Sequence, residues 1–302
     1  MSWLEPLPRD AWELRLQRLA LAVLIVLRLP NLPRDVSQPF PAGIARWIDF
    51  TFLADSRIDV CVSTLFAGAL ALYVLGRALP LATGILMAVW VAYGALANSQ
   101  GGIGHHTQLL GLVLLAQCLA HLRAALARLP AARRAAAAQA LAVDYTVQVI
   151  VACYVLAGLM KVVLSRGLWF VQIPFIASDI AKTHSQVYAS TGELALLGRA
   201  DWLATFALSH PMLMRLLVGP SLLLELCTPL ALLGRRSALL IGLGLIAMHR
   251  GIDFLMLIQF RENEALVWIY LVNLPWLLVC GARALRGRLA VRTPRPLPGA
   301  EA

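Results

Sequence analysis

The chain has 302 residues, of which 60% are hydrophobic and only 14% are charged, and its mean hydropathy is +0.75. Soluble globular domains carry about 25% charged residues, so the composition excludes an ordinary soluble domain and predicts a polytopic membrane protein. No alternating barrel pattern is present, and the predicted fold class is therefore all-α, a helical bundle. The net charge of +10 would suggest a nucleic-acid partner in a soluble protein. Here the distribution of the charge along the chain explains it, and no nucleic acid is expected.

Eight apolar stretches are long enough to be predicted as membrane spans. By residue number they cover about 16–32, 60–79, 81–97, 105–122, 141–164, 211–233, 237–260 and 265–279.

Two connecting segments are expected to lie in the membrane interface. The aromatic-rich segment 34–59 is too polar to span, and the long connection 165–210 is expected to contain an amphipathic helix at 192–208. Residues 261–264 are expected to form a short turn. Together, residues 1–282 form one transmembrane domain, followed by a basic tail, 283–302, that is expected to be disordered.

Basic residues gather on one side of these predicted spans. The short turn 98–104 has no basic residue, whereas the loops on the side of the two termini and the tail are rich in arginine. The positive-inside rule therefore predicts cytoplasmic N- and C-termini in a cell inner (plasma) membrane. Membrane lipid, including anionic lipid, is an expected partner.

The five cysteines all fall in apolar segments, and none belongs to a CxxC pair. Buried free thiols are therefore expected, rather than a disulfide framework or a zinc site. The sequence shows no internal repeat and no paired broken helices, so solute transport is the least favoured function.

Lys161 is the residue on which the functional interpretation is centred. Only two of the 26 basic residues are lysines, and this one lies inside the predicted fifth span. An ionisable group in a membrane marks a functional site by default, and removal from water favours the neutral amine, which can act as a base. Alternatively, a lysine near the end of a span can reach the interface as an anchor. Position alone leaves both interpretations open.

Two adjacent histidines, His105 and His106, open the predicted fourth span at a depth similar to that of Lys161. A shared outward-facing pocket is therefore predicted. Adjacent histidines on a helix point apart, so no metal site is expected.

Four further ionisable residues lie deeper in the predicted spans. Glu225 is in the sixth span, and His249, Arg250 and Asp253 are in the seventh. Arg250 and Asp253 are spaced so that they can face each other on one helix. These groups either line a pocket or form a purely structural ion network, and both interpretations stay open.

Several motifs along nearly the whole chain resemble the membrane part of the vitamin K-dependent gamma-carboxylase superfamily. Its compact bacterial members are the horizontally transferred transmembrane (HTTM) domain proteins, some of which act in toxin maturation. The motifs that carry the resemblance are His106-Thr107-Gln108-Leu109-Leu110-Gly111, Ala157-Gly158-Leu159-Met160-Lys161, Ser165-Arg166-Gly167-Leu168-Trp169, Glu225 with Pro229, and His249 with Phe260-Arg261-Glu262-Asn263.

The resemblance implies a lysine-based membrane enzyme. Lys161 would deprotonate a reduced quinone similar to vitamin K hydroquinone, with His106 orienting or stabilising the reacting species. Oxygenation would then give the strong base used for carboxylase-like or monooxygenase-type chemistry on a secreted peptide. The expected pocket residues are His105, Trp169, Glu225, His249, Arg250 and Asp253.

Two features depart from the carboxylase pattern. No large luminal domain is expected, and the step from Lys161 to Trp169 is longer. The alternative function is a non-catalytic membrane protein for toxin-peptide maturation, export or immunity. To separate the two, Lys161→Ala is expected to abolish activity and to leave insertion and stability nearly intact.

Overall fold

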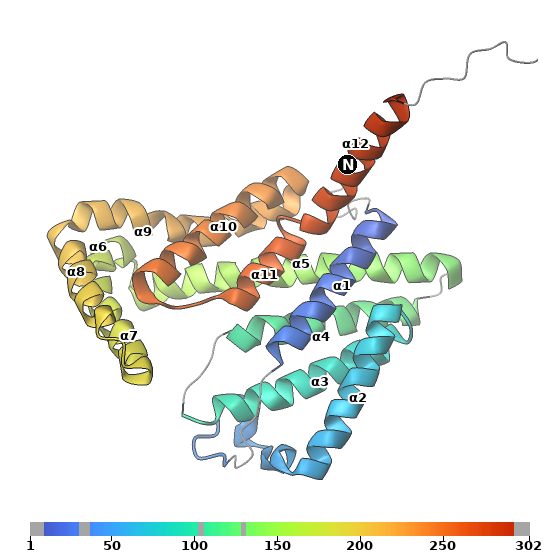
Figure 1. Cartoon of the computed structure of the whole chain (residues 1–302), viewed down its shortest axis with the longest axis horizontal. Coiled ribbons are helices and arrows are strands. Elements are labelled where there is room, and N and C mark those ends of the chain that lie inside the picture. Colours follow the sequence, from blue (N-terminus) through green and yellow to red (C-terminus); the bar gives the residue numbers. More distant parts are fainter. Residues whose placement is uncertain (1–8, 30–36, 102–105, 128–130, 293–302) are drawn as a thin grey trace, which may run out of the picture.

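The computed structural model describes residues 9–29, 37–101, 106–127 and 131–292, and within these ranges the chain is helical with no strand (Figure 1). The elements are α1 (Ala11–Arg28), η1 (Gly43–Arg46), η2 (Thr51–Ala54), α2 (Ser56–Leu75), α3 (Leu79–Asn98), α4 (His106–Leu126), α5 (Ala131–Leu164), α6 (Trp169–Gln172), η3 (Ile173–Phe175), α7 (Ile176–Thr191), α8 (Ala195–Ser209), α9 (Pro211–Leu226), η4 (Thr228–Leu233), α10 (Arg235–Met256), α11 (Arg261–Tyr270) and α12 (Leu274–Arg292).

Five of the described helices are long and apolar enough to cross a membrane, namely α2, α3, α4, α10 and residues 137–164 of α5. The number rises to seven if each of two bent helix pairs is one span. The chain is therefore an all-α membrane protein, as its composition predicts. The expected first span exists as α1, but its four charged residues leave it outside this set.

Two pairs of consecutive helices are bent, one just before the predicted sixth span and one within the predicted eighth span. α8 and α9 meet at 98°, and α9 ends at Leu226, where the 3-10 turns of η4 begin. α11 and α12 meet at 43° beside Asn273, which has a positive φ of 58°. The predicted span 211–233 corresponds to α9 and η4, whereas the predicted span 265–279 is bent within its length, which the sequence did not predict. Bent pairs were also not expected from the sequence, so that argument against transport does not hold.

Residues 261–264 form the first turn of α11 rather than a separate turn. The amide of Glu264 donates to the carbonyl oxygen of Phe260, which continues the helical pattern. Glu262 and Glu264 are both buried in this turn, where carboxylates interact favourably with the positive end of a helix dipole.

α8 nearly matches the helix expected at 192–208, but other parts of the connecting segments and the tail differ from expectation. Segment 34–59 contains the two short 3-10 turns η1 and η2, not one helix, and α7 was not expected. α12 continues to Arg292, because Ala, Leu and Arg in its sequence favour a helix. Residues 283–292 are therefore helical, whereas 293–302 lie outside the described residues. Cys61, Cys227 and Cys280 are exposed, not buried.

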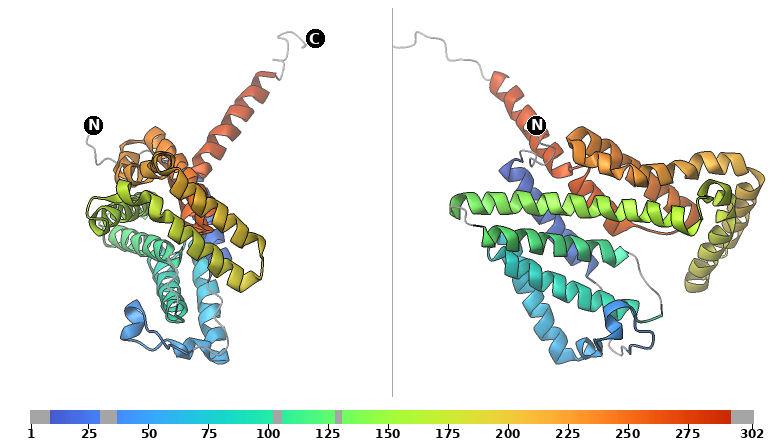
Figure 2. Two further views of the ribbon diagram at one scale, coloured as in Figure 1. Left: turned by 90° about the vertical axis from the view of Figure 1, so that its left-hand side faces the viewer. Right: turned by 180° about the vertical axis from the view of Figure 1, so that it is seen from behind.

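The long helix α5 runs through the middle of the molecule (Figures 1 and 2). It packs on α4 along one side and on α9 and η4 along another, and α3 and α2 follow beyond α4. A buried polar network ties these layers together: Tyr73 donates to the side-chain carbonyl of Gln117, whose amide donates to Thr146 and Tyr270. α7 and α8 lie side by side at the far end from α2.

A buried carboxylate fixes the start of α1 against the rest of the bundle. Glu13 is fully buried and accepts hydrogen bonds from Arg235 at 2.9 and 2.8 Å and from Asn273 at 2.7 Å. It also closes the capping box with Asp10. One side chain thus joins α1, α10 and the link between α11 and α12.

Candidate functional site

Lys161 and Glu225 form an ion pair between α5 and α9. The Lys161 Nζ donates to Glu225 Oε1 at 2.6 Å and to Oε2 at 2.7 Å. The carboxylate side chain is only 5% exposed, whereas the lysine side chain is 26% exposed. The lysine is therefore the accessible member of the pair, and the carboxylate lies behind it. This contact brings together two residues that the sequence placed in separate spans.

The close approach of α9 to α5 depends on Gly158, one turn before the lysine. A Cβ atom there would lie 3.0 Å from a Leu226 methyl carbon and 3.2 Å from the Glu225 Cβ. Further along the same face, the Thr228 hydroxyl donates to the Val151 carbonyl oxygen at 3.3 Å. The small residue in the Ala-Gly-Leu-Met-Lys motif thus gives room for the glutamate.

Trp169 provides the second contact of the lysine. Its ring lies at the start of α6, and the Lys161 Nζ is 5.3 Å from the ring centroid, within the range of a cation–π interaction. The indole Nε1 is buried and has no hydrogen-bond partner among the described residues. Although eight residues separate Lys161 from Trp169 in the sequence, the turn after α5 brings the tryptophan ring back beside the lysine.

His249 belongs to a neighbouring cluster that also involves α5. Its Nε2 is 3.3 Å from the Tyr154 hydroxyl oxygen, and its ring stacks on Phe260 at 4.8 Å. The Nδ1 atom is buried without a partner among the described residues. Tyr154 lies two helical turns before Lys161 on the same face of α5. Phe260 belongs to the motif named with His249 in the sequence, whereas Tyr154 was not expected at the site, although the periodicity of α5 could have identified it.

Arg250 pairs with a residue that the sequence had placed in a turn. Its Nη2 is 2.6 Å from Glu264 Oε2 of α11. Asp253 is half-buried, and its carbonyl oxygen accepts the Leu257 amide. The expected partnership of Arg250 with Asp253 is therefore replaced by an inter-helix pair, because α11 brings a buried carboxylate to the arginine.

The two histidines before α4 are placed only in part. His105 and the side chain of His106 lie outside the described residues. α4 and α5 are antiparallel, and Gln117 bonds to Thr146 between them. At about 1.5 Å per residue, the backbone of His106 then lies roughly 6 Å short of the level of Lys161. A shared pocket of the histidines and Lys161 therefore stays a prediction.

Several exposed apolar side chains lie close to the lysine along the chain, namely Leu159, Met160, Val163, Leu164 and Leu168, and Leu164, three residues on, is on the same side of α5. In a membrane protein such a surface suits contact with lipid or with a lipid-soluble molecule. Two apolar pockets of about 460 and 490 Å³ occur elsewhere, and neither is lined by Lys161 or Glu225. The site thus lies at the surface of the bundle, where Lys161 is partly exposed and Glu225 is buried beneath it.

The ion pair changes the expectation for Lys161→Ala. Removing the ammonium leaves the buried Glu225 carboxylate without its partner, and such a change destabilises a protein. The prediction that stability stays nearly intact is therefore not supported by this geometry, and a variant that removes both charges is the better probe.

Neither a metal site nor a related protein identifies the function of this site. Within the described residues, no group of three or more His, Cys, Asp and Glu side chains is arranged to hold a metal ion. No protein-family model, no curated protein and no solved structure matches this chain.

Proposed function

We propose that this protein is an integral membrane enzyme in which Lys161 and Glu225 together remove a proton from a lipid-soluble hydroxyl compound of the reduced-quinone type. One observation carries the proposal: Lys161 donates to both oxygens of a buried carboxylate while its own side chain remains accessible. This arrangement places a proton donor and acceptor at the edge of the bundle, with a proton store behind it.

The pair can perform the proton step in a defined order. The ammonium of Lys161 first gives one proton to the Glu225 carboxylate, which lies within hydrogen-bond distance. The resulting neutral amine then takes a proton from the bound hydroxyl group. The pair ends as an ammonium and a carboxylic acid, so its net charge rises from zero to +1 opposite the new oxyanion. No oxidant is needed for this step.

The residues around Lys161 fit a reduced quinone. The buried Trp169 Nε1 lacks a partner among the described residues and can donate to a quinol oxygen, and the neighbouring surface is apolar. Lys161, Trp169 and the exposed aliphatic residues beside them would hold the molecule. When bound, a reduced quinone supplies an ionisable hydroxyl group and an electron-rich ring.

The proposed acceptor and membrane orientation rest on the sequence. The resemblance to the gamma-carboxylase superfamily supports a secreted peptide as acceptor, with His106 assisting. The distribution of arginine supports an inner-membrane location with both termini in the cytoplasm. Lys161 then faces the outer side.

A second candidate is a non-catalytic membrane scaffold. The observation that favours it is that charged pairs join separate parts of the fold in several places. Besides Lys161–Glu225, these pairs are Arg9–Asp144, Arg28–Glu262, Arg235–Glu13, Arg250–Glu264 and Arg283–Asp10. Under this function Lys161 only fixes α5 against α9.

Mass spectrometry of co-purified lipid-soluble molecules separates the two candidates. The wild type should retain a quinone, and the double variant Lys161→Met/Glu225→Leu, which removes both charges, should lose it. Arg57→Gln, at an exposed arginine on α2, is the control and should retain it. Equal quinone content in the double variant and the wild type would support the scaffold.

A further inference from the structure

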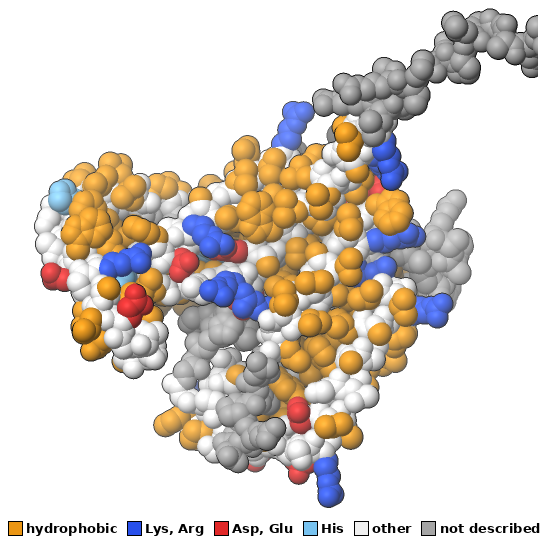
Figure 3. Space-filling model, viewed as in Figure 1, with side chains coloured by type: hydrophobic (Ala, Val, Ile, Leu, Met, Phe, Trp, Pro, Cys, Tyr) orange, Lys and Arg blue, Asp and Glu red, His pale blue; other side chains and the backbone are white. Residues whose placement is uncertain are grey.

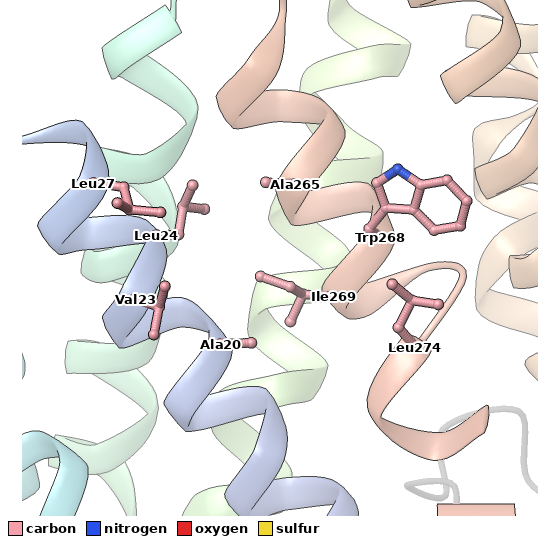
Figure 4. A pocket seen from close by; sticks show the side chains of 8 residues that line it. All are labelled: Ala20, Val23, Leu24, Leu27, Ala265, Trp268, Ile269 and Leu274. Carbon is pink, nitrogen blue, oxygen red and sulfur yellow. The ribbon is translucent and has the colours of Figure 1, made fainter. Parts of the chain in front are cut away.

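A groove between α1 and α11 has apolar walls along its whole length. Its volume is about 460 Å³, and it is lined by Ala20, Val23, Leu24, Leu27, Ala265, Trp268, Ile269 and Leu274 (Figure 4). Leu27 is 71% exposed, and Val23 is also exposed. On a membrane protein, such an open apolar groove suits a hydrocarbon chain better than water.

One end of the groove carries Arg28 and Arg250, and Arg261 is also exposed there at the start of α11. Arg28 follows Leu27 directly on α1, and its Nε is 3.3 Å from Glu262, one turn before Ala265 on α11. Arg250 reaches Glu264, the residue next to Ala265. Figure 3 shows charged side chains gathered beside the hydrophobic surface on this face.

The arginines, not the glutamates, are presented outward at this end. The side chains of Glu262 and Glu264 are 8% and 7% exposed, whereas those of Arg28 and Arg250 are 29% and 65% exposed. Each guanidinium has five N–H donors, and its closest contact to its glutamate uses only one nitrogen. Both arginines therefore keep donors for a second anion.

A third polar atom lies at the same end. Asn263, between the two glutamates, has a buried side-chain oxygen with no hydrogen-bond partner among the described residues. This acceptor suits a hydroxyl donor. A ligand that matches all three features carries an apolar chain, a phosphate for the arginines and a hydroxyl group.

We propose that this groove is a binding site for an anionic glycerophospholipid. The phosphate lies against Arg28 and Arg250, and one acyl chain runs between α1 and α11 toward Leu274. The site is separate from the Lys161–Glu225 pair and does not depend on the proposed enzyme function.

The test is native mass spectrometry of the full-length detergent-purified protein with phosphatidylglycerol or phosphatidylcholine added. Phosphatidylglycerol should bind at least roughly tenfold more tightly. Arg28→Gln/Glu262→Gln, which removes both charges of one pair, should reduce this preference, and Ala265→Leu, which fills the groove, should weaken the binding of both lipids. Arg57→Gln and Ala67→Leu, at exposed positions of α2, should leave the preference and both affinities unchanged.

Three results would overturn the proposal. The first is equal binding of the two lipids by the wild type. The second is an unchanged affinity for phosphatidylglycerol in Ala265→Leu, which alters no charged group and so remains informative if the double variant does not fold. The third is complete displacement of phosphatidylglycerol by penta-glutamate, which would assign the arginines to an acidic peptide.

Discussion

The Lys161 ammonium lies 2.6 and 2.7 Å from the two carboxylate oxygens of Glu225, across the contact between α5 and α9. Most of the lysine side chain is covered, and nearly all of the glutamate side chain is. Substitutions of Lys161 and Glu225 should therefore change both the free energy of unfolding and the ability of the pair to remove a proton.

Removing one charge of the pair should cost stability, and removing both should restore it. Lys161→Met leaves a buried carboxylate unpaired, so we expect a loss of about 1 to 3 kcal/mol. Lys161→Met/Glu225→Leu should regain most of this loss and remain inactive. Thermal unfolding in detergent measures the change. Equal stability of the single and double variants would show that the pair is not coupled.

Gly158→Ala should separate α5 from α9. The added Cβ would press on Leu226 and Glu225 at 3.0 and 3.2 Å, so we expect a loss of about 1 to 3 kcal/mol together with loss of quinone retention. The matched control is Gly68→Ala on α2, where no atom lies within 4 Å, and this change should stabilise its helix by up to about 1 kcal/mol. A similar change in stability in the two variants would contradict the role of Gly158 in the close contact between α5 and α9.

The Tyr154–His249 contact should contribute about 1 kcal/mol. We expect Tyr154→Phe and His249→Phe each to lower the free energy of unfolding. The double variant should lose less than the sum of the two single losses. His249→Phe keeps a ring against Phe260, so the cycle isolates the polar contact. Strictly additive losses would mean that the two side chains do not interact.

Glu13→Ala should be among the most destabilising single changes in the bundle. The variant leaves Arg235 and Asn273 without their shared acceptor at a fully buried position, and we expect a loss of about 3 kcal/mol or more. Arg15→Ala, on the exposed side of the same helix, is the control. A comparable loss in both variants would exclude a special role for Glu13.

Asp10 should give a small acid-sensitive contribution to stability. Its pKa lies below the ordinary 3.8, first because the Trp12 amide donates to the carboxylate and then because Arg283 does. A group whose pKa is lowered in the folded state stabilises the fold above its unfolded pKa and loses this effect as the pH falls through the folded value. The advantage of the wild type over Asp10→Asn should therefore be present at pH 7 and shrink below about pH 4. Melting curves at pH 7 and pH 3 compare the two, and a constant difference would contradict the assignment.

The sequence predicted the helices that are formed by long local apolar segments. It did not predict the bends and buried charges that depend on packing between distant helices. α3 and α10 follow the predicted spans closely, because each is a long apolar segment with clear ends. The bend after Ser209 and the burial of Glu264 depend on contacts between distant helices, which no local pattern records.

The candidate site shows the same division. Lys161, Trp169 and Glu225 could be chosen by residue type and position, and the structure brings all three together. The pairing of Arg250 could not be predicted, because its partner Glu264 was placed in a loop. Gly158 could be read as part of a motif, but its use as the contact point for α9 required the fold.

The most direct test of the central claim is the ultraviolet difference spectrum of 2-methyl-1,4-naphthohydroquinone bound anaerobically to the purified protein at pH 7. Free phenolic hydroxyl groups keep their protons at this pH, since their pKa values lie near 10. We expect the spectrum of the ionised hydroquinone with the wild type and with Arg57→Gln, and the neutral spectrum with Lys161→Met/Glu225→Leu. The ionised spectrum in the double variant, or a neutral spectrum with fully occupied wild type, would contradict the assignment of Lys161 and Glu225 as the base.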